Sequence, residues 1–229
     1  MLELYFKTKS KGPLKQTIIK SILAGVYVAF GSFFFLTVRA LPNSEVISAL
    51  VFPLGLILCV LAGGNLFSID CLAIGSKIPK FGGYLALIYI FNCVGALLTA
   101  YLIFLAGVEP EGAITIAVNK NDLPLLLTFW RGIIYNILIG VAVIVAFNTN
   151  NTFGKIAILT LPLACVITPN AFEGSVSGMF FLSYGLLLGA NMAIWDVAAT
   201  IVLTVLGNII GGFIIGYIYL NVLKEDGID

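Results

Sequence analysis

Two acidic side chains stand inside otherwise apolar stretches of this chain. Asp70 follows the sequence Gly63–Ser68, and Glu173 follows Thr168–Asn170; both of these sequences interrupt a hydrophobic segment. An ionised side chain at membrane depth is costly, so such residues usually face a cavity or a partner. We expect each carboxylate to accept hydrogen bonds from backbone amides freed at the opposite interruption. A proton-relay role is the alternative.

The chain lacks the usual catalytic and metal-binding residues. It contains no histidine, which is the commonest metal ligand and general base. Its cysteines share no CxxC spacing and lie in or beside apolar runs, which predicts small buried side chains. The cysteines are Cys59, Cys71, Cys93 and Cys165. We therefore expect no enzyme, no cofactor and no metal site.

The composition predicts a membrane protein. Hydrophobic residues make up 60% of the chain and charged residues 10%, whereas soluble domains carry roughly 25% charged residues. The mean hydropathy is +1.10. The net charge of +1 gives no sign of nucleic-acid binding.

Six apolar stretches approach the length of about 20 residues that a helix needs to cross a bilayer. They cover approximately 17–38, 46–63, 84–105, 125–147, 155–188 and 194–220. The remaining segments are a cytoplasmic arm (1–16), an extracytoplasmic linker (108–124) and a cytoplasmic tail (221–229).

The basic residues predict that both termini lie on the cytoplasmic side of the cell (inner or plasma) membrane. In that orientation nine lysines fall inside and three basic residues outside, which matches the positive-inside rule. The inner lysines are Lys7, Lys9, Lys11, Lys15, Lys20, Lys77, Lys80, Lys155 and Lys224, and the outer residues are Arg39, Lys120 and Arg131.

The two interrupted stretches hold corresponding places, each in the middle of three spans, within 17–107 and 125–220. Backbone freed from a helix at membrane depth is tolerated only where protein or a water-filled cavity shelters it. Matched interruptions are typical of an inverted repeat with its pathway near the midplane. The pattern thus predicts a single all-α domain of six transmembrane helices in two inverted three-helix repeats. Two unrelated helix kinks are the alternative.

Several other features could guide a solute. Amides at the start of each half-helix after a break attract anions. Lys120 could concentrate anions at the outer mouth, or it could be a solvated surface lysine. Asn136, in the middle of a span, must find a partner and either joins helices or braces a broken segment.

Several motifs, in order along nearly the whole chain, resemble those of the formate–nitrite transporter family. Gly64–Ser68 resembles the family's G-x-E-L-F-T loop, and Arg131–Asn136 resembles its R-G-x-x-C-N sequence. Phe172–Phe180 resembles F-E-H-S-[IV]-A-N-M-F, and Lys120 matches the family's vestibule lysine.

The resemblance implies an aquaporin-like protomer that assembles as a homopentamer in the lipid bilayer, with one pore per protomer. The implied substrates are small monovalent anions or their conjugate acids, such as formate, nitrite, acetate, lactate or hydrosulfide, and protons could accompany them. The implied constrictions are Phe52, Leu56, Phe67 and Ile167, and the implied pore centre is Leu66, Ser68, Glu173 and Gly174. The resemblance also implies that Lys120 lies in the vestibule and that Asn136 supports the pore.

The chain departs from the family pattern at the pore centre. Gly174 stands where the family has a histidine, Gly178 replaces an asparagine, and Asn65 replaces the loop glutamate. Glycine cannot donate a titratable proton, and we expect it to widen the lumen. Two mechanisms stay open.

In the first mechanism, Lys120 and the half-helix ends draw an anion inward. The less polar surroundings raise its pKa, so it takes a proton from water and crosses as the neutral acid. In the second, a wider pore passes a larger acid or a neutral molecule. An aquaporin-like channel for a small neutral solute is the alternative function.

Overall fold

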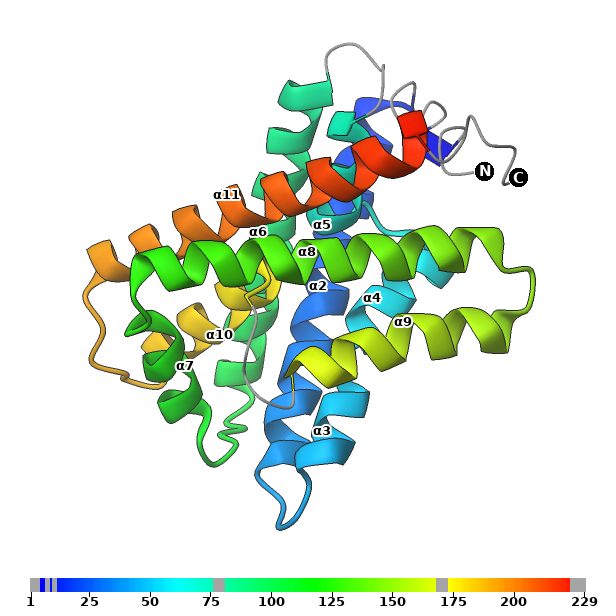
Figure 1. The fold of residues 1–229 in the computed structure, drawn as a ribbon. Helices are drawn as coiled ribbons and strands as arrows, with labels where there is room; N and C mark the ends of the chain where they lie inside the picture. The colour runs from blue at the N-terminus through cyan, green and yellow to red at the C-terminus, as the bar shows by residue number, and fades with distance from the viewer. Residues whose placement is uncertain (1–4, 7–8, 10–11, 76–80, 168–172, 223–229) are drawn as a thin grey trace.

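The computed structural model describes residues 5–6, 9, 12–75, 81–167 and 173–222 as helices joined by short connections (Figure 1). Five of its helical segments are long and apolar enough to cross a membrane. They are Leu14–Arg39, Glu45–Gly63, Gly83–Leu105, Leu125–Asn148 and Ile194–Val222. The remaining predicted span corresponds to two shorter apolar helices, α9 (Thr152–Ile167) and α10 (Ser175–Leu187), so the chain is a multi-pass membrane protein.

The first half contains a broken second span, as predicted. Its elements are α2 (Leu14–Arg39), α3 (Glu45–Val51), α4 (Leu54–Leu58), a π-helical turn (Cys59–Gly63), α5 (Phe67–Asp70), a 3₁₀ turn (Cys71–Gly75) and α6 (Phe81–Leu105). Between the π-helical turn and α5 the backbone is extended at Gly64 and Leu66. Glycine and asparagine in this stretch disfavour a continuous helix.

The second half repeats this order after one additional helix. Its elements are α7 (Ala113–Asn121), α8 (Leu125–Asn148), α9 (Thr152–Ile167), α10 (Ser175–Leu187), α11 (Ile194–Tyr217) and a π-helical turn (Ile218–Val222). The break predicted at Thr168–Asn170 lies outside the described residues. The predicted linker was incomplete, because α7 occupies its centre. Ala113, Ala117 and Lys120 lie at helical spacing and are all buried.

The two halves pack their first and last helices in the same way. Helix α2 packs on α6 in the first half, and α8 packs on α11 in the second. A methyl group at Gly95 of α6 would overlap the Ile22 carbonyl oxygen, and one at Gly211 of α11 would overlap the Ile133 carbonyl oxygen. These matched close contacts support the predicted inverted repeats.

Contacts near the two ends of the described chain place both on one side of the molecule. The ring centroid of Tyr5 lies 4.8 Å from that of Phe147, near the end of α8. Asn148, the last residue of α8, donates a hydrogen bond to the hydroxyl of Tyr219, in the turn after α11. This arrangement agrees with an even number of crossings.

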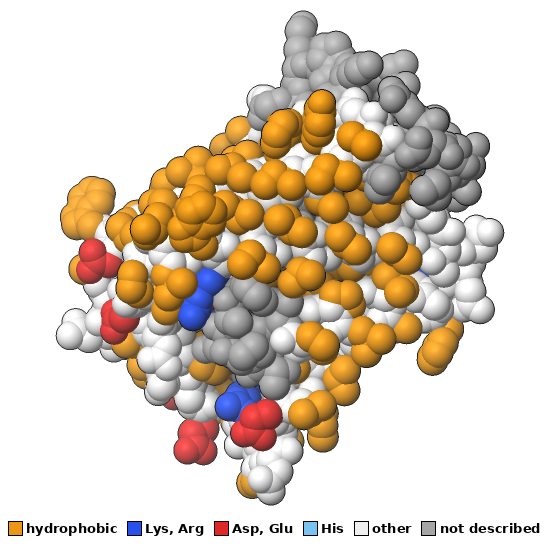
Figure 2. All heavy atoms as spheres, in the orientation of Figure 1, with side chains coloured by type: hydrophobic (Ala, Val, Ile, Leu, Met, Phe, Trp, Pro, Cys, Tyr) orange, Lys and Arg blue, Asp and Glu red, His pale blue; other side chains and the backbone are white. Residues whose placement is uncertain are grey.

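Apolar side chains cover much of the outer surface. Figure 2 shows them across the face formed by α8, α9 and α11. Leu126 is 68% exposed, Trp130 54% and Val202 53%. Soluble monomers rarely expose a continuous apolar surface of this kind, so lipid or a neighbouring protomer is the fitting environment.

Candidate pore

An asparagine of the third span holds the backbone of the first break. The Asn92 side-chain amide on α6 donates to the carbonyl oxygens of Ser21 (2.7 Å) and Asn65 (2.8 Å). Its side-chain oxygen accepts the Phe67 backbone N–H at 2.8 Å. One buried side chain therefore satisfies backbone groups that the broken helix leaves free.

Asn208 of α11 makes the same set of bonds at the second break. Its amide donates to the carbonyl oxygens of Gly132 (2.9 Å) and Glu173 (3.0 Å), and its oxygen accepts the Ser175 N–H at 2.9 Å. We call Asn92 and Asn208 the asparagine clamps. Sequence analysis missed both, although each is a polar residue in an apolar span, the same signal that singled out Asn136.

The asparagine clamps occupy the first backbone amide of each half-helix. The Phe67 and Ser175 amides begin the half-helices α5 and α10. Both donate to an asparagine, so neither is free to attract an anion.

Both acidic residues form buried ion pairs. Lys9 lies 2.6 Å from Asp70, with 8% and 0% of their side chains exposed. Lys120 lies 2.8 Å from Glu173, with 7% and 4% exposed. We had expected amides of the opposite break as partners; the partner that the described residues give each carboxylate is a lysine distant in sequence.

Lys9 stays charged within its pair. Burial alone would lower the pKa of this lysine, but the Asp70 carboxylate and the Tyr5 hydroxyl outweigh that effect and raise the pKa overall. The Lys9 ammonium also donates to Tyr5 at 3.0 Å. The described part of the N-terminal arm is thus attached to the broken second span.

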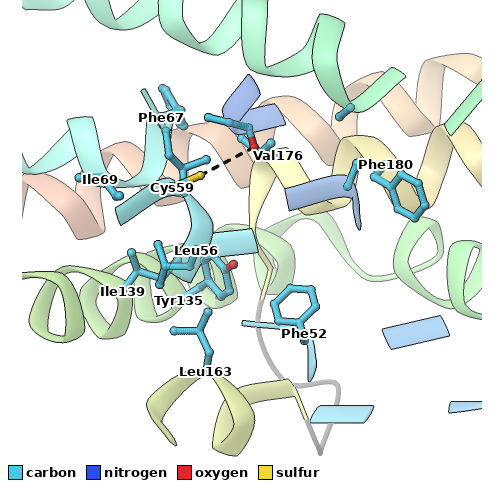
Figure 3. Packing of buried hydrophobic residues seen from close by; sticks show 14 of the residues in the cluster. Phe52, Leu56, Cys59, Phe67, Ile69, Tyr135, Ile139, Leu163, Val176 and Phe180 are labelled. Atoms are coloured by element: carbon cyan, nitrogen blue, oxygen red, sulfur yellow. Dashed lines mark hydrogen bonds between the residues drawn. The ribbon is translucent and has the colours of Figure 1, made fainter. Parts of the chain in front are cut away.

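A cavity of about 20 Å³ lies between the two breaks. Figure 3 shows Phe52, Leu56, Tyr135 and Leu163 arranged around it, with Phe67 farther away. Its lining consists of Val28, Phe52, Gly55, Leu56, Leu66, Ser68, Tyr135, Ile139, Leu163, Gly174, Val176 and Ser177. This volume suits roughly one water molecule.

The structure brings half of the predicted site residues to this cavity: Phe52, Leu56, Leu66, Ser68 and Gly174 line it. Phe67 instead packs on the Tyr89 ring, with centroids 4.7 Å apart. The side chain of Ile167 lies outside what the structure describes. The wider lumen expected from Gly174 is not seen, because the Tyr135 ring fills the space beside it.

Asn136 of α8 connects the first broken segment to helix α11. Its side-chain amide donates to the Ser68 carbonyl oxygen (3.2 Å), after the first break, and to the Asn208 carbonyl oxygen (2.6 Å) on α11. The residue is fully buried. These contacts fit both predicted roles, since one bond braces a broken segment and the other joins two helices.

A cluster of three aromatic rings, Phe35, Phe52 and Phe181, borders the cavity at Phe52, and we call it the aromatic constriction. The rings of Phe52 and Phe181 stack with centroids 6.4 Å apart, and Phe35 packs edge-on against both. The Lys120 ammonium lies 5.4 Å from the centroid of Phe181. Lys120 is thus neither a solvated surface lysine nor a lining residue of the cavity, but it adjoins the aromatic constriction.

Larger hollows lie on either side. One of about 600 Å³ on the N-terminal side is lined by Tyr5, Lys9, Gly12, Gln16, Thr17, Lys20, Gly63, Gly64, Asn65, Tyr84, Phe147 and Lys155. It reaches Asn65, next to the cavity residue Leu66. The other hollow, of about 520 Å³, reaches Phe35 of the aromatic constriction. The three spaces thus follow one another through the protein.

Comparisons with known proteins identify the family. The family model described as "Formate/nitrite transporter" matches residues 3–221. The chain belongs to this family. It is 31% identical to a probable formate transporter of Methanothermobacter thermautotrophicus, over 95% of this chain and 92% of that protein. It is 27% identical to the formate channel FocA of Escherichia coli strain K12, over 92% and 87%.

Solved structures of the family share the fold of this transporter. A pentameric formate channel with formate bound superposes with a TM-score of 0.81 at 22% identity, over 92% of this chain and 97% of that one. An FNT family ion channel gives 0.82 at 20% identity, over 93% and 90%. The transporter is therefore not an enzyme. Among its described residues, no three Cys, Asp or Glu side chains come together to hold a metal ion.

Proposed function

We propose that the chain is a channel or transporter for small monovalent anions or their conjugate weak acids, of the formate, nitrite, hydrosulfide, acetate or lactate class. The observation that carries this proposal is the neutral cavity between two clamped helix breaks, with a hollow on either side. Relatives that carry the names of formate transporters and channels support the substrate class.

The proposed assembly is a homopentamer in the cell membrane, with both termini cytoplasmic. The pentameric channel of the same fold supports this assembly. Lys9, Lys20 and Lys155 line the hollow on the N-terminal side, which fits the positive-inside rule. Of these, Lys20 and Lys155 would attract anions to that entrance, because the charge of Lys9 is offset by Asp70.

The cavity lining favours passage of the neutral acid. Its twelve residues carry hydroxyl groups at Ser68, Tyr135 and Ser177, and no charged side chain. A bare anion would pay a large desolvation cost there. As the surroundings become less polar, the anion's pKa rises, and it takes a proton from water. Phe52 and Leu56, with Phe181, form the proposed apolar barrier that the neutral acid crosses.

Uptake into proteoliposomes tests the proposal. Formate, nitrite, hydrosulfide, lactate and chloride are compared at external pH 5.5 and 7.5, with protein-free liposomes as the control. We expect uptake of the weak acids to rise at the lower pH and chloride to be excluded. Osmotic swelling with glycerol, together with no uptake of any weak acid, would instead favour a channel for a neutral solute.

A further inference from the structure

Tyr135 occupies the space beside Gly174 in the central cavity. A Cβ atom added at Gly174 would lie 2.6 Å from Cε1 and Cζ of the Tyr135 ring and 2.7 Å from its hydroxyl oxygen. Both residues line the cavity, and Tyr135 is 6% exposed. Even an alanine at position 174 would therefore force the phenol ring to move.

The backbone does not require glycine at position 174. Its φ of −96° and ψ of 131° are extended values that any residue adopts. Leu66, which begins the other half-helix, has nearly the same torsion angles, −96° and 127°. The reason for glycine is thus the neighbouring side chain and not the conformation of the main chain.

The two halves place a small and a large side chain at corresponding positions, but in the reverse order. Asn92 and Asn208 bind the carbonyl oxygens of Ser21 and Gly132, so these two positions correspond. Three residues later, Ala24 of α2 corresponds to Tyr135 of α8. The first half combines this alanine with Leu66, and the second half combines a tyrosine with Gly174. Each half therefore places one large side chain at its break. In the first half it comes from the residue that begins the half-helix (Leu66), and in the second half from the neighbouring long helix (Tyr135).

The Tyr135 hydroxyl lies in a short chain of polar groups. The Ser177 side chain lines the same cavity, and its hydroxyl donates to the Gly174 carbonyl oxygen at 3.1 Å. The single Ser177 proton is therefore engaged with the backbone. Rotation about the phenol C–O bond can direct the Tyr135 proton to a solute oxygen in the cavity.

We propose that the Tyr135 hydroxyl is the hydrogen-bond donor that selects oxygen-bearing weak acids in the cavity, and that Gly174 is small in order to admit it. This inference rests on the proposed function, since it names the group that meets the solute. A phenol donates a hydrogen bond to a carboxylate, or to the carbonyl oxygen of its acid, without having to give up its proton. Selection thus needs no proton transfer from the protein.

The Tyr135→Phe variant tests the donor role, because it keeps the ring and removes the hydroxyl. We expect formate uptake to fall by about three- to tenfold, as the loss of one hydrogen bond to a neutral acid predicts. The melting temperature should change little. The control is Tyr101→Phe on α6, where the tyrosine is 50% exposed. Uptake by Tyr135→Phe at the wild-type rate would overturn the inference.

A mutant cycle tests the pairing of Tyr135 with Gly174. Gly174→Ala should lower the melting temperature by about 4 °C or more, the effect expected from overpacking a buried site. The drop should be much smaller when Tyr135→Ser is present, because the ring is then absent. Additive drops would refute the pairing. Wild-type protein that takes up no weak acid would defeat the proposed function itself, whereas normal wild-type uptake with an unaffected Tyr135→Phe variant would defeat only this inference.

Discussion

The Lys120–Glu173 pair offers a quantitative test of how a buried ion pair holds the start of α10 to α7. The Lys120→Met variant leaves the Glu173 carboxylate buried without its partner. At their separation of 2.8 Å, two unit charges attract by about 6 kcal/mol at the effective dielectric constant near 20 typical of proteins. Dehydration of both groups offsets part of that attraction, and removal of one partner of a buried pair costs about 3–5 kcal/mol.

The expected loss is measurable as a shift in melting temperature. For a chain of this length, about 3–5 kcal/mol corresponds to a decrease of about 10 °C in thermal melting of the purified protein in detergent. The double variant Lys120→Met/Glu173→Gln should recover most of the loss, because it leaves no unpaired charge.

An exposed ion pair provides the matched control. Arg39 and Glu45 lie 2.6 Å apart, but their side chains are 39% and 55% exposed. Breaking it with Arg39→Met should cost less than about 1 kcal/mol. If Lys120→Met were no more destabilising than Arg39→Met, the buried pair would not stabilise the fold as argued here.

Further predictions follow from the clamps, the N-terminal arm and the close helix contacts. Asn92→Ala and Asn208→Ala should each lower the free energy of unfolding by about 2–4 kcal/mol in thermal melts, because each change leaves three buried backbone groups without a hydrogen-bond partner. If either variant kept the wild-type stability, the two asparagines would not have matched roles. Because the Lys9 pKa is raised, the stability lost in Lys9→Met should be equal at pH 7 and pH 9 and should shrink only above the usual lysine range of about 10.4. A stability difference between wild type and Lys9→Met that is already smaller at pH 9 than at pH 7 would contradict a raised Lys9 pKa. Gly211→Ala should destabilise by about 1–3 kcal/mol, since its methyl group overlaps backbone. Gly178→Ala, whose methyl group would meet nothing within 4 Å, should not destabilise the protein.

The position of the first helix break could be read from the sequence because its cause is local. Glycine and asparagine interrupt the apolar run at Gly63–Asn65, and the described structure is extended after Gly63. The predicted residues that line the cavity near this break came instead from the family resemblance. Leu66 and Ser68 follow the break directly, and Phe52 and Leu56 are about one helical turn apart.

The ion-pair partners depended on the fold and could not be read from the sequence. Lys9 is 61 residues from Asp70, and Lys120 is 53 residues from Glu173. Only the packed structure brings these residues together. The helix that carries Lys120 was missed because its flanking glutamates and its polar end were interpreted as a solvated linker.

The side chain that fills the space beside Gly174 could not be predicted from the sequence either. A glycine in place of a larger residue suggests empty space, but the size of a cavity depends on every side chain that faces it. Tyr135 lies 39 positions before Gly174, and nothing in that spacing indicates that its ring turns toward the glycine.

The most direct test of the pathway is to block the cavity and measure formate uptake into proteoliposomes. Leu56→Trp adds an indole to the cavity lining, and Leu206→Trp makes the same change on α11, where the leucine is 45% exposed. The account predicts that Leu56→Trp, reconstituted as folded protein, loses uptake, while Leu206→Trp transports like the wild type. Wild-type uptake by folded Leu56→Trp would show that solutes cross elsewhere.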